Sequence, residues 1–160
     1  MTAPPIAHPK TAATTIADRA RMILGLLLLS SCSGPVSQAD CEYLQTTANE
    51  TLNQVMAVYA DSDAAYSTDN ERLVAILYSE GSQALYEPEI THPKLKPIQD
   101  ALVEVFQKAS DIRYAASELI PAEANTLPTP EAEQQILALQ VQSEAEIPSK
   151  LQALAEVCRR

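Results

Sequence analysis

Apolar side chains recur at steps of three and four residues along much of the chain, which is the spacing of one face of an α-helix. The clearest run extends from Ile98 to Leu119 and begins just after Pro97, a residue suited to a first helical turn. A similar run covers about Asp40 to Tyr59, and a weaker one covers Leu73 to Leu85. The pattern predicts three amphipathic helices. Their expected buried positions are Cys41, Leu44, Ala48, Leu52, Val55 and Tyr59; then Leu73, Ile76, Leu77, Ala84 and Leu85; then Ile98, Leu102, Val105, Ala109, Ile112, Ala116 and Leu119.

A fourth helical pattern follows Thr129-Pro130, which resembles an N-cap residue followed by a proline at the first helical position. Pro148 falls inside this pattern, yet the apolar phase continues past it to the end of the chain. Because proline removes a helix hydrogen bond, we expect either a kinked helix or two abutting helices there. The expected buried positions are Ala132, Ile136, Leu139, Ser143, Ile147, Leu151, Leu154 and Cys158.

The segments between these patterns are rich in proline, as in Glu87 to Pro97 and Pro121 to Pro130, and are therefore predicted to be loops. The chain has 3 glycines in 160 residues, which disfavours an all-β fold with many tight turns. Gly81 lies inside the second helical pattern and costs that helix about 1 kcal/mol relative to alanine. We predict an all-α fold, an up-down-up-down bundle of about four helices.

Ahead of the first helix lies a segment typical of export. Arg19 and Arg21 precede an apolar run, residues 22–29, that is far shorter than the roughly 20 residues needed to span a bilayer. A short apolar run after basic residues has the form of a signal-peptide core. The residues that follow, Leu29-Ser30-Ser31-Cys32, resemble the lipobox of bacterial lipoproteins: an aliphatic residue, two small residues and a cysteine.

The lipoprotein resemblance implies a lipid anchor. It implies that the Cys32 thiol receives a diacylglyceryl group, that the chain is cut before Cys32, and that the new amine receives an acyl chain such as palmitate. Several acyl chains make a lasting membrane anchor, whereas one binds weakly. Residues 1–31 are thus the predicted signal peptide, 32–39 the lipidated tether and 40–160 the bundle domain. Ser33, where an Asp would imply retention at the inner membrane, implies the outer membrane with the domain facing the periplasm. The alternative is an ordinary buried helix followed by a chance cysteine.

Two cysteines remain after the predicted cleavage, Cys41 and Cys158. Because bacterial compartments beyond the inner membrane are oxidising, we predict a disulfide between them, worth roughly 5 kcal/mol by the chain-entropy model. In an up-down-up-down bundle the first helix starts where the fourth ends, so the pairing and the topology support each other. Two buried free thiols remain the alternative. A zinc site is disfavoured, because one histidine and no CxxC spacing do not supply four ligands.

The net charge and the few reactive side chains exclude several kinds of function for this chain. The full chain carries a net charge of −10, and the predicted mature chain, with 20 acidic and 8 basic side chains, carries −12. Such a charge excludes nucleic acid as an expected partner. The one histidine of the mature chain, His92, is expected to be a solvated loop residue, because no nucleophile or orienting partner accompanies it. We therefore expect no enzyme and no cofactor beyond the covalent lipid at Cys32.

Two further groups of side chains leave their roles open. Four carboxylates near the second helix are expected to form a solvated helix end rather than a Ca²⁺ site, because Tyr66 and Arg72 stand where an EF-hand loop needs Gly and Glu. Tyrosines outnumber the single Phe and suit either the rim of a thin bundle or an interface. The carboxylates are Asp61, Asp63, Asp69 and Glu71, and the tyrosines are Tyr43, Tyr59, Tyr66, Tyr78, Tyr86 and Tyr114.

Together these features predict a membrane-anchored envelope lipoprotein that acts as a non-enzymatic binding or accessory subunit. Small helical pilotin lipoproteins are similar in size, anchor and helix content, which is an analogy without a shared motif. The expected partner is an envelope protein, docked for instance as an amphipathic helix in a groove, and its binding residues are not identified by the sequence. The alternative is a periplasm-facing lipoprotein that binds a small ligand or a cation.

Overall fold

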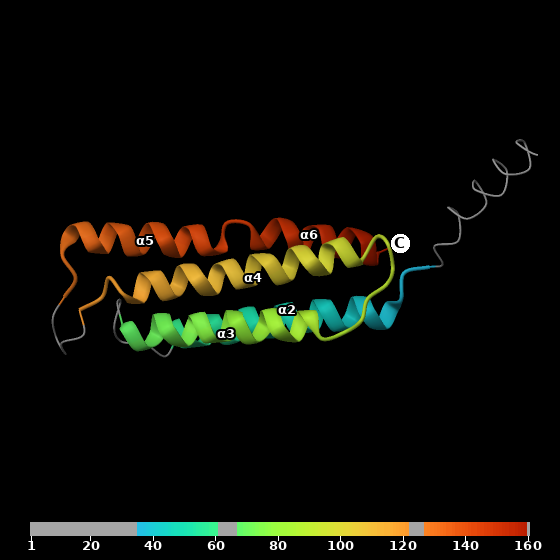
Figure 1. The fold of residues 1–160 in the computed structure, drawn as a ribbon, viewed down its shortest axis with the longest axis horizontal. Coiled ribbons are helices and arrows are strands. Elements are labelled where there is room, and N and C mark those ends of the chain that lie inside the picture. The colour runs from blue at the N-terminus through green and yellow to red at the C-terminus, as the bar shows by residue number, and fades with distance from the viewer. Residues whose placement is uncertain (1–34, 61–66, 122–126, 160) are drawn as a thin grey trace, which may run out of the picture. The chain divides into compact units, whose positions relative to one another are not determined.

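The computed structural model describes residues 35–60, 67–121 and 127–159, and the part described is helical without strands. The predicted signal peptide and Cys32 lie outside these residues. The helices are α2 (Gln38–Ala60), α3 (Thr68–Tyr86), α4 (Lys96–Ser117), α5 (Pro130–Glu144) and α6 (Ile147–Cys158). They lie side by side as a helical bundle (Figure 1). The prediction of an all-α fold is confirmed.

Local sequence signals set several helix ends. The Thr129 hydroxyl accepts a hydrogen bond from the backbone N–H of Ala132 at 3.2 Å, so the predicted N-cap is confirmed. Pro97 lies in the first turn of α4, also as predicted. Near Pro148 the expected break is present as two abutting helices, α5 and α6. Lys108 of α4 pairs with Glu146 in this break, and its hydrogen bond and charge lower the pKa of the Glu146 carboxyl.

The main core fills the space between α2, α3, α4 and α6. Phe106 and Tyr78 meet edge to face in its middle, with ring centroids 5.7 Å apart. The predicted phase of the first, third and fourth helices agrees with this core at Leu44, Leu102 and Leu154, all fully buried. A smaller cluster joins α4 to α5 through Ala116, Ile120 and Ile136.

The predicted buried face of the second helix is wrong in part. Leu73 and Ile76 were expected in the core, but they are 45% and 41% exposed. The face of α3 that is buried instead includes polar and small residues, so counting apolar side chains misplaces it. Its buried residues are Glu71, Val74, Ala75, Tyr78, Gly81, Ser82 and Leu85.

At Gly81 the backbone of α3 lies close to Thr51 of α2. A Cβ atom at this position would lie 2.4 Å from Thr51 Oγ1 and 2.7 Å from Thr51 Cγ2, well inside van der Waals contact. Thr51 is itself buried and its hydroxyl donates to the Thr47 carbonyl at 2.9 Å. The glycine therefore serves close helix packing, which outweighs its cost in helix propensity.

The first turn of α2 is bonded to the last turn of α6. Cys41 and Cys158 form a disulfide with their Cα atoms 5.7 Å apart, in agreement with the predicted pair. The helix α2 begins at Gln38, inside the range 32–39 predicted as a tether, and Val36 already packs against the core.

None of the helices within the described ranges is long and apolar enough to span a bilayer.

Replacing Gly81 with alanine tests the close packing of α2 on α3. On propensity alone G81A would stabilise the chain, but we expect a loss of about 1–3 kcal/mol, because the added methyl group overpacks against Thr51. Urea unfolding followed by circular dichroism measures the change. Adding Thr51→Ala should recover part of the loss in the double variant; a G81A protein as stable as the parent would contradict the packing.

Candidate functional site

A buried ion pair joins α3 to α4. The guanidinium of Arg113 donates from Nη1 to Glu71 Oε2 at 3.1 Å, and both side chains are 3% exposed. Glu71 lies in the first turn of α3, where the helix dipole favours a carboxylate. Arg113 falls on the same face of α4 as the buried Ala109 and Ala116. Two charges are thus placed where the helix periodicity would put apolar side chains.

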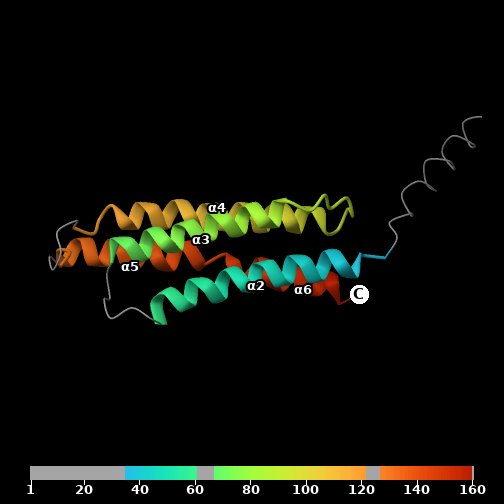
Figure 2. The same ribbon diagram turned by 90° about the horizontal axis from the view of Figure 1, so that it is seen from below.

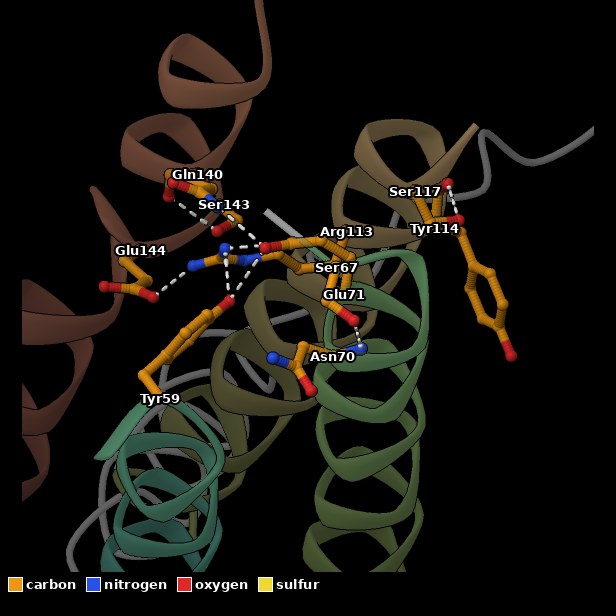
Figure 3. Close-up of polar contacts among 10 residues, drawn as sticks. All are labelled: Tyr59, Ser67, Asn70, Glu71, Arg113, Tyr114, Ser117, Gln140, Ser143 and Glu144. Carbon is orange, nitrogen blue, oxygen red and sulfur yellow. Dashed lines mark hydrogen bonds and ion pairs between the residues drawn. The ribbon is translucent and has the colours of Figure 1, made fainter. Parts of the chain in front are cut away.

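Side chains from α2 and α5 complete the pair (Figure 3). The Tyr59 hydroxyl accepts a hydrogen bond from Arg113 Nη1 at 2.7 Å and donates to Glu71 Oε1 at 3.1 Å. Gln140 Nε2 donates to the same Glu71 oxygen at 2.7 Å, and Arg113 Nη2 donates to Glu144. We call these five residues the Arg113 cluster. It connects α2, α3, α4 and α5 within one hydrogen-bonded network.

Burial and charge act against each other in the Arg113 cluster. Burial alone would lower the pKa of Arg113, but the Tyr59 hydroxyl and the carboxylates Glu71 and Glu144 outweigh it, so the pKa lies above its ordinary value. Burial is also the main reason that the pKa of Tyr59 is raised, with Glu71 adding to the effect and Arg113 opposing it. Arg113 therefore stays cationic and Tyr59 neutral at any physiological pH.

The cluster also leaves polar atoms unsatisfied. Arg113 Nε and the Tyr78 hydroxyl are buried and have no hydrogen-bond partner among the described residues. Burial raises the pKa of Tyr78, and the negative charge of Glu144 raises it further. A buried polar group without a partner costs about 1–3 kcal/mol, and this cost falls both on the Arg113 cluster and on Tyr78 of the main core.

A hollow of about 240 Å³ opens onto the Arg113 cluster between α2 and α5. Tyr59 borders it from α2, and Gln140, Val141 and Glu144 border it from α5, while Arg113 forms its floor. Tyr59 is 38% and Val141 73% exposed. The cluster is therefore not sealed: its α2 and α5 members meet solvent while the Glu71–Arg113 pair beneath them does not.

The arrangement offers hydrogen bonding and charge rather than a set of catalytic groups. Glu71 is occupied by three donors, and Arg113 does not titrate near neutral pH. Within the part of the chain that the structure describes, no group of three or more His, Cys, Asp or Glu side chains is placed to hold a metal ion. The cluster suits recognition of a partner or stabilisation of the fold.

The acidic cluster predicted from the sequence needs a correction. It was expected to be a solvated helix end, but Glu71 is 2% exposed and ion-paired, because Arg113 compensates its charge. Asp69 is exposed as expected, and Asp61 and Asp63 lie outside the described residues.

His92 and the tyrosines divide between loop, core and surface. His92 is half-buried in the segment between α3 and α4, where its Nδ1 accepts a hydrogen bond from the backbone N–H of Lys94 at 3.2 Å. Tyr78 is fully buried, and Tyr86 is 67% exposed. Tyr43 and Tyr59 lie at the surface of the bundle with their hydroxyls bonded to neighbouring helices, and Tyr114 is 44% exposed. Tyr66 is not among the described residues.

Removing the charge of Glu71 tests whether the buried pair holds this end of the bundle together. We expect Glu71→Gln to cost about 3–5 kcal/mol, because Arg113 would be left buried without a full counter-charge. Glu144→Gln is the matched control: its side chain is 50% exposed, so we expect a loss of about 1 kcal/mol or less. Urea unfolding of both variants decides the point, and equal losses would show that Glu71 has no special role.

Sequence reasoning missed the Arg113 cluster, although one signal was present. Arg113 stands four residues after Ala109 and three before Ala116, within the predicted apolar stripe of its helix.

No protein-family model, curated protein or solved structure matches this chain. Its function is therefore argued from its own residues.

Proposed function

We propose that the chain is a non-enzymatic envelope lipoprotein whose helical bundle binds a partner protein at the membrane. The observation that carries the proposal is the order of elements along the chain: basic residues, a short apolar run, Leu29-Ser30-Ser31-Cys32, and then a bundle whose first helix begins at Gln38. An anchor placed so close to a domain holds that domain at the membrane surface and raises its effective concentration there.

The proposal includes an up-down-up-down course for the bundle, with α5 and α6 together as its fourth arm. The disulfide supports this course, because it places the start of α2 beside the end of α6. The close packing of α3 on α4 fits two arms joined by the short segment 87–95. In this topology the disulfide marks one pole, its Cys41 being nine residues after Cys32 in the sequence, and the Arg113 cluster lies toward the other.

Partner binding is supported by the character of the pole away from the anchor. Val141 of α5 is 73% exposed and borders a hollow floored by the Arg113 cluster. Met56 of α2, one helical turn before Tyr59 at the border of this hollow, is 64% exposed. Tyr, Met and Arg, all present here, are enriched at protein interfaces relative to the rest of the protein surface. Ser33, the residue after the proposed lipidated cysteine, supports a location at the outer membrane, facing the periplasm. The acidic net charge of the chain argues against nucleic acid as the partner.

The intact mass of the protein isolated from the membranes of a Gram-negative host tests the anchor. We expect a chain that starts at Cys32 and carries a diacylglyceryl group and an amide-linked acyl chain. A Cys32→Ala variant should remain unprocessed and leave the membrane fraction, while Cys41→Ala should still be lipidated. A mass equal to the full 160-residue chain would contradict the proposal.

A further inference from the structure

The helices α2 and α5 border an open seam. Helix α2 packs against α3 and α6, and α5 packs against α4, whereas α2 and α5 have no extensive contact with each other. Figure 2 shows the C-terminal half of α2 diverging from α5. The 240 Å³ hollow lies between them, and side chains of the Arg113 cluster bridge it.

Exposed apolar side chains follow both sides of the seam. On α5, Leu137 and Val141 are one helical turn apart and are 46% and 73% exposed. On α2, Met56 lies one turn before Tyr59, which borders the hollow. Exposed apolar side chains of α2 and α5, on either side of a hollow with a polar floor, offer a surface to the apolar face of another helix.

The charge at the hollow is negative. Glu144 is the carboxylate among the residues that border it, and Glu71 lies buried in the same cluster, so two carboxylates face one guanidinium, that of Arg113. Neither α2 nor α5 contains a Lys or Arg. Among the residues that border the hollow, Arg113 is the sole cation, and its charge is already compensated by Glu71 and Glu144.

We propose that this seam binds an amphipathic helix of a partner protein, whose apolar face covers Met56, Leu137 and Val141 and whose Lys or Arg side chains reach Glu144. The proposal rests on the proposed function and names the partner's chemistry. A second copy of the chain would bring two acidic seams together, which like-charge repulsion opposes. A small ligand fits less well, because 240 Å³ is below the roughly 300–1,000 Å³ of typical ligand pockets and the polar floor is largely self-paired.

The test uses the full-length Cys32→Ser chain, which cannot be acylated, in buffer without detergent. The probe is a dye-labelled helical peptide of 18 residues made of Leu on one face and Lys on the other. A twin with Glu in place of every Lys and a scrambled Leu/Lys peptide are the comparison probes. Fluorescence anisotropy gives each Kd. We expect saturable binding of the Leu/Lys helix, and at least about tenfold weaker binding of the other two, equivalent to about 1.4 kcal/mol.

Two substitutions at equally exposed leucines locate the binding site. Leu137→Gln in the seam should weaken binding of the Leu/Lys helix about tenfold, while Leu73→Gln on α3, where Leu73 is 45% exposed, should leave it unchanged. Glu144→Gln should weaken binding and reduce its dependence on salt, because one charge pair is lost. Unfolding curves of each variant confirm that the bundle is intact.

Four outcomes would overturn the proposal. They are no binding, equal binding of the Glu twin, equal effects of the two leucine variants, and a self-association that Leu137→Gln abolishes, which would assign the seam to a second copy. Because Cys32→Ser removes the anchor, this binding does not depend on lipidation. If the peptide does not bind but the intact mass shows a lipidated Cys32, the binding site is rejected and the lipid anchor is kept. If the peptide binds but the intact mass shows an unprocessed chain, the lipid anchor is rejected and the binding site is kept.

Discussion

The pairing of Arg113 with Glu71 is the interaction on which one whole end of the bundle depends. Desolvating two such charges costs several kcal/mol for each, and only good geometry with added hydrogen bonds offsets that cost. The neighbours Tyr59 and Gln140 supply those bonds to Glu71, each from a different helix. The buried pair therefore makes all of these hydrogen bonds only when α2, α3, α4 and α5 are all in place. Its main effect is to specify one arrangement of these helices rather than to add net stability.

The two ends of the bundle are consequently stabilised by different interactions: a disulfide and close packing at one end, and a buried polar network at the other. Where α2 begins and α6 ends, the Cys41–Cys158 disulfide joins them covalently. Further along α2, the absence of a side chain at Gly81 lets α3 pack tightly against Thr51. Toward the Arg113 cluster, long polar side chains span the distance between α2 and α5 instead of apolar packing. This is why a hollow remains there and why Met56 and Val141 stay exposed beside it. Under the proposed function, the end away from the anchor is free to receive a partner.

Features that depend on local spacing could be predicted from the sequence. The buried stripe of α4, the Thr129 cap and the break near Pro148 each follow from residues close together in the chain. The Cys41–Cys158 pairing follows from the two cysteines that remain after the predicted cleavage in an oxidising compartment, and the four-helix topology supports it. The phase of α3 could not be predicted in the same way, because Glu71 and Gly81 occupy its buried face while Leu73 points outward. A charged side chain such as Glu71 is normally assigned to the surface. Its burial is explained by its ion pair with Arg113, which lies on another helix. Tertiary pairing of this kind is absent from any single stretch of sequence.

The proposed function and the proposed binding site together require that the seam between α2 and α5 faces a partner in the cell envelope. The most direct measurement is photocrosslinking in intact cells, with p-benzoylphenylalanine placed at Val141 in the seam or at Leu73 on α3. We expect an adduct with one envelope protein from position 141 and none from position 73, and peptide mapping should place the crosslink in a helical segment with Lys or Arg beside its apolar face. Adducts of equal yield from both positions, or from position 73 alone, would contradict the account.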